Sequence, residues 1–214
     1  EDDTEPKIAL TPEQEANLLS FMESDKVYEK YRDEIIILLE TGIRVSELCG
    51  LTVKDLDFQN RSINVDHQFL RDTEVGYYTE PPKTNSGIRQ LPMSDKVYQA
   101  FRRISKNRRK AEPIVIDGYS SFLFLNREGL PKVAGNYEGM VKGLIKKYNK
   151  IHEDRLSNVT PHTFRHTFCT NMDRGMNPNT LQYIMGHSNI TMTLGYYAHG
   201  SFISAKAEIE RLSA

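Results

Sequence analysis

The chain has 214 residues, of which 38% are hydrophobic and 27% are charged; this is typical of one soluble globular domain, alone or with a linker, that buries a sizeable core. The longest apolar run, residues 35–39, is far too short to cross a bilayer, and no signal-peptide pattern opens the chain. The two cysteines, Cys49 and Cys169, stand beside apolar residues, which predicts reduced core thiols rather than a disulfide.

The formal net charge of -1 hides an uneven distribution along the chain. Residues 1–60 hold 15 acidic and 6 basic side chains, whereas residues 61–214 hold 14 acidic and 22 basic ones. Because the longer part is basic, a nearly neutral total does not exclude a face that binds a polyanion. Charge alone remains weak support for such a face.

Helices are predicted for the first part of the chain. Residues 1–10 are acidic and lack periodicity, which predicts a linker or flexible tail. A helix is predicted to start after Thr11, because a threonine cap, a proline at the first helical position and a glutamine at the third form a start signal. Further helices are predicted over 28–40, ended by Gly42, and over 45–51.

Between residues 62 and 93 the period of the apolar residues shortens towards two. Three residues alternate with polar ones at the start of this segment: Ile63, Val65 and His67. The cluster at 84–87 (TNSG) marks a tight turn. This pattern predicts a small antiparallel sheet with Lys83 at the mouth of its hairpin.

Helical patterning resumes after the sheet, over residues 95–110, 136–151, 162–174, 178–185 and 202–212. The chain is therefore predicted to have a mainly α fold with a small antiparallel β-sheet (α+β). Such a fold is shared by many kinds of protein and does not by itself identify a function.

Four short segments hold residue types suited to phosphoryl transfer with a protein nucleophile. They are 41–48 (TGIRVSEL), 161–168 (PHTFRHTF), 186–188 (GHS) and 196–199 (YYAH). Breaking a DNA phosphodiester without a metal needs donors on the nonbridging oxygens, an in-line nucleophile and an acid for the departing 5′ oxygen. Arginine grips phosphate bidentately and stays charged. A tyrosine phenolate can form a reversible phosphodiester.

Helical spacing places His162 and Arg165 on one face of a helix, with Phe164 and Phe168 towards the core. An alternative use of this helix is a zinc site, formed by His162, His166 and Cys169. Because the chain has neither a Cys-x-x-Cys nor a His-Glu-x-x-His pattern, no metal site is predicted.

Together these segments resemble the catalytic domain of the tyrosine recombinase (phage-type integrase) family. In detail, their sequences look most like those of integrases of conjugative transposons. The resemblance covers roughly residues 8–205. It divides the chain into a linker or tail over 1–10, a catalytic domain over 11–200 and a C-terminal helical tail over 201–214. Since members of the family carry an N-terminal DNA-binding part, the resemblance also implies that this part is missing here.

The resemblance assigns catalytic roles to six residues: Arg44, Lys83, His162, Arg165, His187 and Tyr197. The two arginines would clamp the scissile phosphate, and His187 would hydrogen-bond it. Segment 82–92 (PKTNSGIRQLP) resembles the family's hairpin, whose lysine protonates the 5′ oxygen. His162 would act as a base or orienting group. Without the resemblance, Arg44 and Lys83 would be exposed loop residues and His187 a helix cap.

Two adjacent tyrosines compete as the nucleophile. Tyr197 is favoured over Tyr196 because it stands directly before a small residue and a histidine, ten residues after His187, as in the family. Glu47 would orient Arg44 or a nearby histidine without contacting the scissile phosphate itself.

The implied reaction is attack by Tyr197 on a core-site phosphate of double-stranded DNA, leaving a 3′-phosphotyrosyl bond and a free 5′ hydroxyl. That hydroxyl would attack a partner duplex, and strand exchange would pass through a Holliday junction to integrate or excise a mobile element. The resemblance implies no metal and no nucleotide cofactor. It implies a homo-oligomer, a tetramer in synapsis, with an excisionase or a DNA-bending host factor as accessory partner, acting at the nucleoid in the bacterial cytoplasm.

Two basic clusters could follow the DNA backbone, and their candidate residues are Arg102, Arg103, Lys106, Lys142 and Lys146. Each phosphate that they neutralise would steepen the salt dependence of binding, but a solvated helix face explains either cluster as well. The segment 202–212 has an amphipathic pattern. It would dock on a neighbouring protomer, fold back on its own, or only complete the core.

Two other functions stay open at this point. A type IB topoisomerase would use the same tyrosine chemistry to relax supercoils without exchanging partners. A non-catalytic DNA-binding regulator would keep the fold without the reaction, although all six expected side chains are present.

Overall fold

The computed structural model describes residues 9–82, 84–108, 114–173, 175–191 and 193. The helices of this part are α1 (Pro12–Ser24), η1 (Glu29–Tyr31), α2 (Arg32–Thr41), α3 (Val45–Gly50), η2 (Val53–Asp55), η3 (Asn85–Gly87), α4 (Asp95–Asn107), α5 (Ala134–Ile151), α6 (Pro161–Asp173) and α7 (Pro178–Met185). The strands are β1 (Leu56–Asp57), β2 (Ser62–Val65), β3 (Gln68–Asp72), β4 (Gly76–Glu80) and β5 (Arg89–Pro92). Among these helices, none has the length and apolar character needed to cross a membrane.

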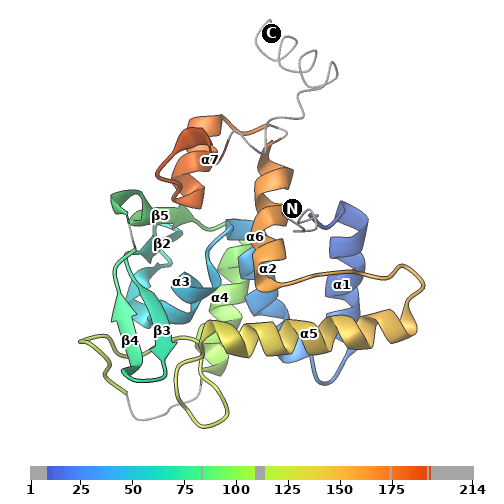
Figure 1. The fold of residues 1–214 in the computed structure, drawn as a ribbon, viewed down its shortest axis with the longest axis horizontal. Coiled ribbons are helices and arrows are strands. Elements are labelled where there is room, and N and C mark those ends of the chain that lie inside the picture. The colour runs from blue at the N-terminus through green and yellow to red at the C-terminus, as the bar shows by residue number, and fades with distance from the viewer. Residues whose placement is uncertain (1–8, 83, 109–113, 174, 192, 194–214) are drawn as a thin grey trace, which may run out of the picture.

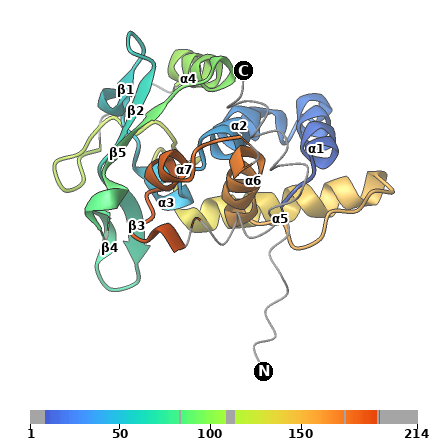
Figure 2. The same ribbon diagram turned by 90° about the horizontal axis from the view of Figure 1, so that it is seen from above.

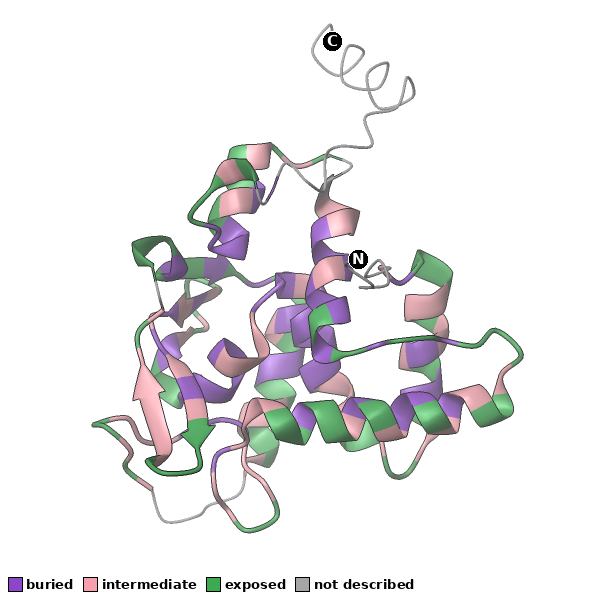
Figure 3. Cartoon of the chain, in the orientation of Figure 1, coloured by how far each residue is buried: buried purple, intermediate pink, exposed green. Residues whose placement is uncertain are grey.

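Helices α2 and α6 lie at the centre of the molecule, with α5 across one end of α6 and α7 near the other end (Figure 1). Helix α2 packs against α4 and α6, and its residues 35–39 are all buried. Seen from above, α7 lies between β5 and α6 (Figure 2), and it contacts both. Buried residues gather in α2, α3 and α6, whereas exposed residues alternate with buried ones along α5 (Figure 3).

The signals that start and end the first helices are confirmed. Thr11 caps α1: its hydroxyl accepts from the amide of Gln14, and the Gln14 side chain accepts from the amide of Thr11, both at 3.1 Å. Helix α2 ends at Gly42, which has a positive φ of 63°. A Cβ at Gly42 would overlap the ring of Phe168, so this turn requires glycine both for its backbone conformation and for its close approach to α6.

The prediction of antiparallel strands is confirmed, but the prediction of one sheet is wrong. Strands β1, β2 and β5 form one sheet, and β3 and β4 form a separate hairpin. The pair Ile63–Leu91 joins β2 to β5 across the intervening hairpin. Alternation of apolar residues reveals which face of a strand is buried, but it does not reveal which strand is the partner.

The predicted core positions of Phe164 and Phe168 on α6 are confirmed, since both side chains are buried. Ile63, Val65 and His67, which alternate with polar residues, are buried as well. Both cysteines are buried free thiols. Leu10, at the end of the predicted linker, is buried too, and its amide donates to Oγ1 of Thr167 at 3.0 Å.

Candidate active site

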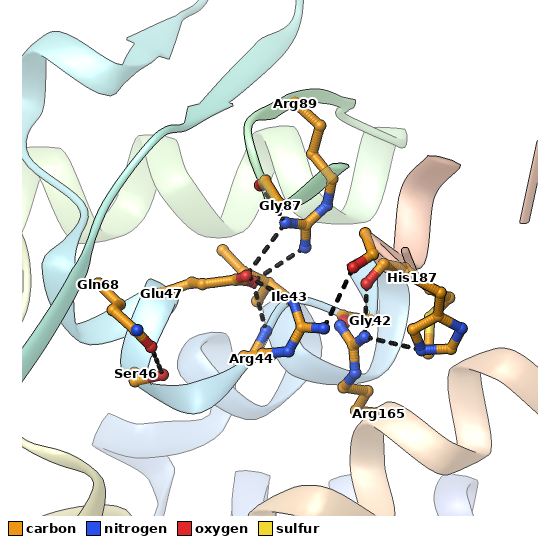
Figure 4. A network of polar contacts seen from close by, with 12 residues as sticks. Gly42, Ile43, Arg44, Ser46, Glu47, Gln68, Gly87, Arg89, Arg165 and His187 are labelled. Atoms are coloured by element: carbon orange, nitrogen blue, oxygen red, sulfur yellow. Dashed lines mark hydrogen bonds and ion pairs between the residues drawn. The ribbon is translucent and has the colours of Figure 1, made fainter. Parts of the chain in front are cut away.

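The carboxylate of Glu47 lies at the centre of a polar network that joins α3, β5 and the end of α7 (Figure 4). Its Oε1 accepts from Nη1 of Arg44 at 2.8 Å and from Nη1 of Arg89 at 3.1 Å. Its Oε2 accepts from the amide of Arg44 and from Nη2 of Arg89, both at 2.9 Å. Burial alone would raise the pKa of Glu47, but the hydrogen bonds and charges of Arg89, and then of Arg44, outweigh it and lower the pKa. The carboxylate is therefore ionised at neutral pH.

Arg44 stands directly before α3 and is the part of this network most open to solvent. Its side chain is 37% exposed, whereas those of Glu47 and Arg89 are 2% and 0% exposed. Its Nη2 also reaches the carbonyl oxygen of Gly186 at 3.3 Å. An anion arriving from solvent would therefore meet the guanidinium of Arg44 first.

Arg165 comes from the middle of α6 and is buried. Its Nη1 donates to the carbonyl of Gly42, and its Nη2 donates to the carbonyl of Met185 at 2.5 Å. The carbonyls that Arg44 and Arg165 contact at the end of α7 belong to adjacent residues, Gly186 and Met185. Segments distant in sequence thus bring two guanidinium groups to one place (Figure 4).

His187 follows the left-handed Gly186 that ends α7, and it is 6% exposed. Its Nε2 lies 3.2 Å from Nη2 of Arg165, and its Nδ1 lies 3.0 Å from Oγ1 of Thr193. Since arginine can only donate, Nε2 accepts, and in the neutral ring Nδ1 donates to Thr193. Burial, followed by the charges of Arg165, Arg44 and Arg89, lowers the pKa of His187 to about 4, so the ring is neutral at pH 7.

The charges of this network do not cancel. Arg44, Arg89 and Arg165 each carry a positive charge, Glu47 carries a negative one, and His187 is neutral. Because two of the arginines and the histidine meet at the end of α7, the excess positive charge is concentrated in a partly desolvated place. Such a site favours an anion with several acceptor oxygens, such as a phosphate.

The structure places the other expected catalytic residues as follows. His162 is exposed in the first turn of α6, one turn before the buried Arg165. Lys83 lies outside the described residues, but the carbonyl of Ser86 lies 3.1 Å from the position of a Cβ on Gly186. The loop that follows Lys83 therefore packs against the end of α7. Tyr197 also lies outside the described residues, four positions after Thr193.

The basic candidates for DNA binding do not join this network. Arg103 forms an ion pair with Asp33 at 2.6 Å, so its charge already has a partner. Arg102 stacks over the ring of Phe58, and Lys106 is exposed on the same helix, α4. Lys142 and Lys146 are exposed on α5, the helix at the other end of α6 from α7 (Figure 1).

Sequence reasoning missed Arg89, which is as central to the network as Glu47. Its Nε donates to the carbonyl of Ile184 at 2.7 Å, and its Nη1 to that of Gly87 at 2.8 Å. A signal was present: Arg89 is two residues from Leu91 and so shares the buried face of β5. An arginine on the core face of a strand needs buried partners. Glu47 is the one acidic residue in the four quoted motifs, so it was the candidate partner.

Within the described residues, one group of side chains has the spacing of a metal site: Asp55, Asp66 and His67. It lies at the C-terminal end of α3, away from Arg44. Both ring nitrogens of His67 already have partners, Nδ1 with Asp66 at 2.5 Å and Nε2 with the carbonyl of Gly50 at 2.8 Å. This group shares no residue with the arginine network.

Comparison with known proteins agrees with this geometry. A sequence model described as the phage integrase family matches residues 9–202. The chain belongs to the phage integrase family. It is 62% identical to the transposase of transposon Tn916 from Enterococcus faecalis over all 214 residues, which cover 53% of that relative. It is 28% identical to the tyrosine recombinase XerA of Pyrococcus furiosus over 196 residues, covering 90% of the chain and 57% of the relative. The chain thus spans about half the length of these relatives.

Solved structures of the family have the same fold. The Tn1549 transposon integrase, bound to circular intermediate DNA, superposes with a TM-score of 0.93 at 62% identity, covering 99% of this chain and 68% of that one. The catalytic domain of bacteriophage HP1 integrase superposes with a TM-score of 0.56 at 19% identity, covering 96% of both chains. The predicted α+β fold is therefore confirmed as the catalytic-domain fold of tyrosine recombinases.

Proposed function

We propose that this chain is the catalytic part of a conjugative-transposon integrase, which breaks and rejoins DNA strands through a covalent 3′-phosphotyrosyl intermediate. The observation that carries the proposal is the meeting of Arg44, Arg165 and His187 at the end of α7. This arrangement can hold a phosphodiester by its nonbridging oxygens without a metal. The Tn916 transposase, at 62% identity, supports the same class of reaction.

In the proposed reaction Arg44 and Arg165 each grip nonbridging oxygens of the scissile phosphate. The hydroxyl of Tyr197 loses its proton, with His162 as base or orienting group, and its oxygen attacks phosphorus. The bond from phosphorus to the 5′ oxygen breaks, and Lys83 protonates that oxygen. The 5′ hydroxyl of a partner strand then gives its proton to Lys83 and attacks the phosphorus. The bond from phosphorus to the oxygen of Tyr197 breaks, and the phenolate takes up a proton to become the phenol again.

The contact with Thr193 allows the ring of His187 to change tautomer during the reaction. The hydroxyl of Thr193 can accept from Nδ1 or donate to it. When a phosphate takes over the guanidinium of Arg165, the ring can change tautomer, so that Nε2 donates to the phosphate while Nδ1 accepts from Thr193. The neutral state favoured by burial is the state that can make this exchange.

The substrate in this proposal is double-stranded DNA at the core sites of a mobile element. Structures of the Tn1549 integrase with circular intermediate DNA and with transposon right end DNA support this choice. Four protomers would form the synapse, with contacts made by the tail over 201–214, and strands would exchange through a Holliday junction. An excisionase or a DNA-bending host factor would assist, in the cytoplasm of a bacterium. Because the chain spans about half of its relatives, their remaining half would complete the grip on the duplex.

A nicked suicide duplex, from which the cleaved end diffuses away, tests the proposal. Two proteins are assayed: the chain alone, and the chain joined to the part of the Tn916 transposase that it does not align with. The reactions contain EDTA, and the products are separated on a denaturing gel. We expect a covalent adduct with the wild type and with Tyr196→Phe, and none with Tyr197→Phe. If both proteins bind the duplex but neither forms an adduct, a non-catalytic DNA-binding regulator is favoured. If they relax a supercoiled plasmid but yield no recombinant DNA, a type IB topoisomerase is favoured.

A further inference from the structure

Arg89 is a buried cation, and each of its three side-chain nitrogens donates to another part of the network. Its side chain has no exposed surface, and burying a charge is costly unless it is paired and hydrogen-bonded. Its guanidinium meets that condition with the carboxylate of Glu47 and the carbonyls of Ile184 and Gly87. The bidentate pair with Glu47 uses the planar geometry that only arginine offers.

Each acceptor of Arg89 lies on a segment that carries an expected catalytic residue. Glu47 holds Arg44 through its other hydrogen bonds. Ile184 lies three residues before His187, and Gly87 lies four residues after Lys83. A Cβ on Gly186 would lie 3.0 Å from Nη1 of Arg89, so the end of α7 packs directly on this guanidinium. One buried side chain thus fixes three segments relative to one another.

Arg89 also decides how firmly Glu47 holds Arg44. Oε1 of Glu47 accepts from both arginines, with 2.8 Å to Arg44 and 3.1 Å to Arg89. With Arg89 present, one carboxylate charge is shared between two guanidinium groups. Without it, Arg44 would be the remaining charged partner of the buried carboxylate among the described residues, and Arg44 would be drawn away from an incoming phosphate.

We propose that Arg89 is a positioning residue for phosphate binding: it acts through Glu47 on Arg44, and it fixes the end of α7 and the loop after Lys83 against α3. It does not touch the substrate. This proposal rests on the proposed function, and Arg89→Lys is the informative variant. Lysine keeps the charge but cannot reproduce two parallel hydrogen bonds to Glu47 together with the bonds to both carbonyls.

The first test is a double-variant cycle on the single-turnover rate of adduct formation. We expect Arg89→Lys to slow adduct formation by about 10- to 100-fold and to change duplex affinity by less than about threefold, because misplacement by an ångström costs that much in rate. Since Arg89 acts through Arg44, the double variant with Arg44→Lys should be far less impaired than the product of the two single effects. Multiplicative effects, or a rate that falls only in step with the amount of folded protein, would overturn the proposal.

The second test does not depend on catalysis. In ¹⁵N NMR spectra of the free protein, Arg89→Lys should shift the guanidinium resonances of Arg44 and the imidazole resonances of His187. The control, Arg32→Lys, changes another paired arginine, one that contacts Glu23 and the carbonyl of Leu19, and should leave those resonances in place. Unmoved resonances in Arg89→Lys would overturn the proposal. The two proposals can fail separately. If Arg89→Lys shifts these resonances but the wild-type protein forms no adduct with DNA, the proposed function is contradicted and the positioning role of Arg89 is retained.

Discussion

Nη2 of Arg165 lies 3.2 Å from Nε2 of His187, so a buried arginine on α6 holds the histidine that follows α7. Burial of the ring, and after it the positive charge of Arg165, opposes protonation, so both together keep His187 neutral. The same contact fixes which ring nitrogen faces the arginine. A phosphate that replaces His187 as the acceptor of Arg165 would therefore change the state of both side chains.

The stability of the protein should depend on pH through His187. The ring takes up a proton near pH 6.5 when unfolded and at about 4 when folded, so between these values only the unfolded state is protonated. The free energy of unfolding should therefore fall as the pH drops from 6.5 towards 4, by up to about 1.4 kcal/mol per unit from this group. Urea titrations of the wild type and of His187→Gln at pH 7 and pH 4.5 measure it. If the wild type and His187→Gln differ in their free energy of unfolding by the same amount at pH 7 and at pH 4.5, the lowered pKa of His187 is contradicted.

Replacing Glu47 by glutamine should destabilise the fold and free the arginines from their shared partner. Within the part of the chain that the structure describes, the change removes the carboxylate that pairs with Arg44 and with the fully buried Arg89, at a cost of about 3–5 kcal/mol. Since the pKa of Glu47 is lowered, its contribution is present above the unfolded carboxyl pKa and is lost as the pH falls through the folded one. Chemical denaturation at pH 7 checks the size. Glu23→Gln, which changes a carboxylate with a 70% exposed side chain, should stay within about 0.5 kcal/mol of the wild type.

Substitution of Gly42 should be severe because two separate restraints meet there. Alanine would have to adopt a φ of 63° and its Cβ would overlap Phe168; strain and overpacking together should cost about 2–4 kcal/mol. The matched control is Gly76→Ala, at a φ of 84° with nothing within 4 Å of an added Cβ, which should cost only about 1 kcal/mol. Thermal unfolding of both variants separates the two effects, and equal losses would show that contact with Phe168 is unimportant.

Arg44→Lys should reduce adduct formation strongly while it leaves folding intact. Lysine keeps the charge but loses the fork that grips two oxygens at once, so we expect a fall of about 10²-fold in the rate of the chemical step. The measurement is single-turnover cleavage of the suicide duplex, with Arg32→Lys as the control that should keep the wild-type rate. A rate within threefold of the wild type would exclude Arg44 from the phosphate clamp.

The sequence predicted those parts of the fold that depend on local chemistry. The cap at Thr11, the stop at Gly42 and the helix over 178–185 all follow from neighbouring residues, and all are found. The pairing of β2 with β5 was not predicted, because it depends on a partner beyond the intervening hairpin. Arg89 was missed for a similar reason: the alternation along β5 indicates that the side chain is buried, but not that its partners are Glu47 and the end of α7.

For the candidate site, residue types and motif order pointed to Arg44, Arg165 and His187, and the structure brings these three together. What the motifs did not contain was the electrostatic organisation. The sharing of Glu47 between two arginines and the neutral state of His187 depend on burial and on distances of about 3 Å between groups far apart in the chain.

The proposed reaction requires that Tyr197 forms a phosphodiester with DNA. The most direct measurement is tandem mass spectrometry of the adduct after digestion with protease and nuclease, which locates the residue that carries the nucleotide. We expect a nucleotide attached through its 3′ phosphate to Tyr197. Attachment to Tyr196, attachment to any other residue, or a 5′-phosphate linkage would contradict the proposed role of Tyr197.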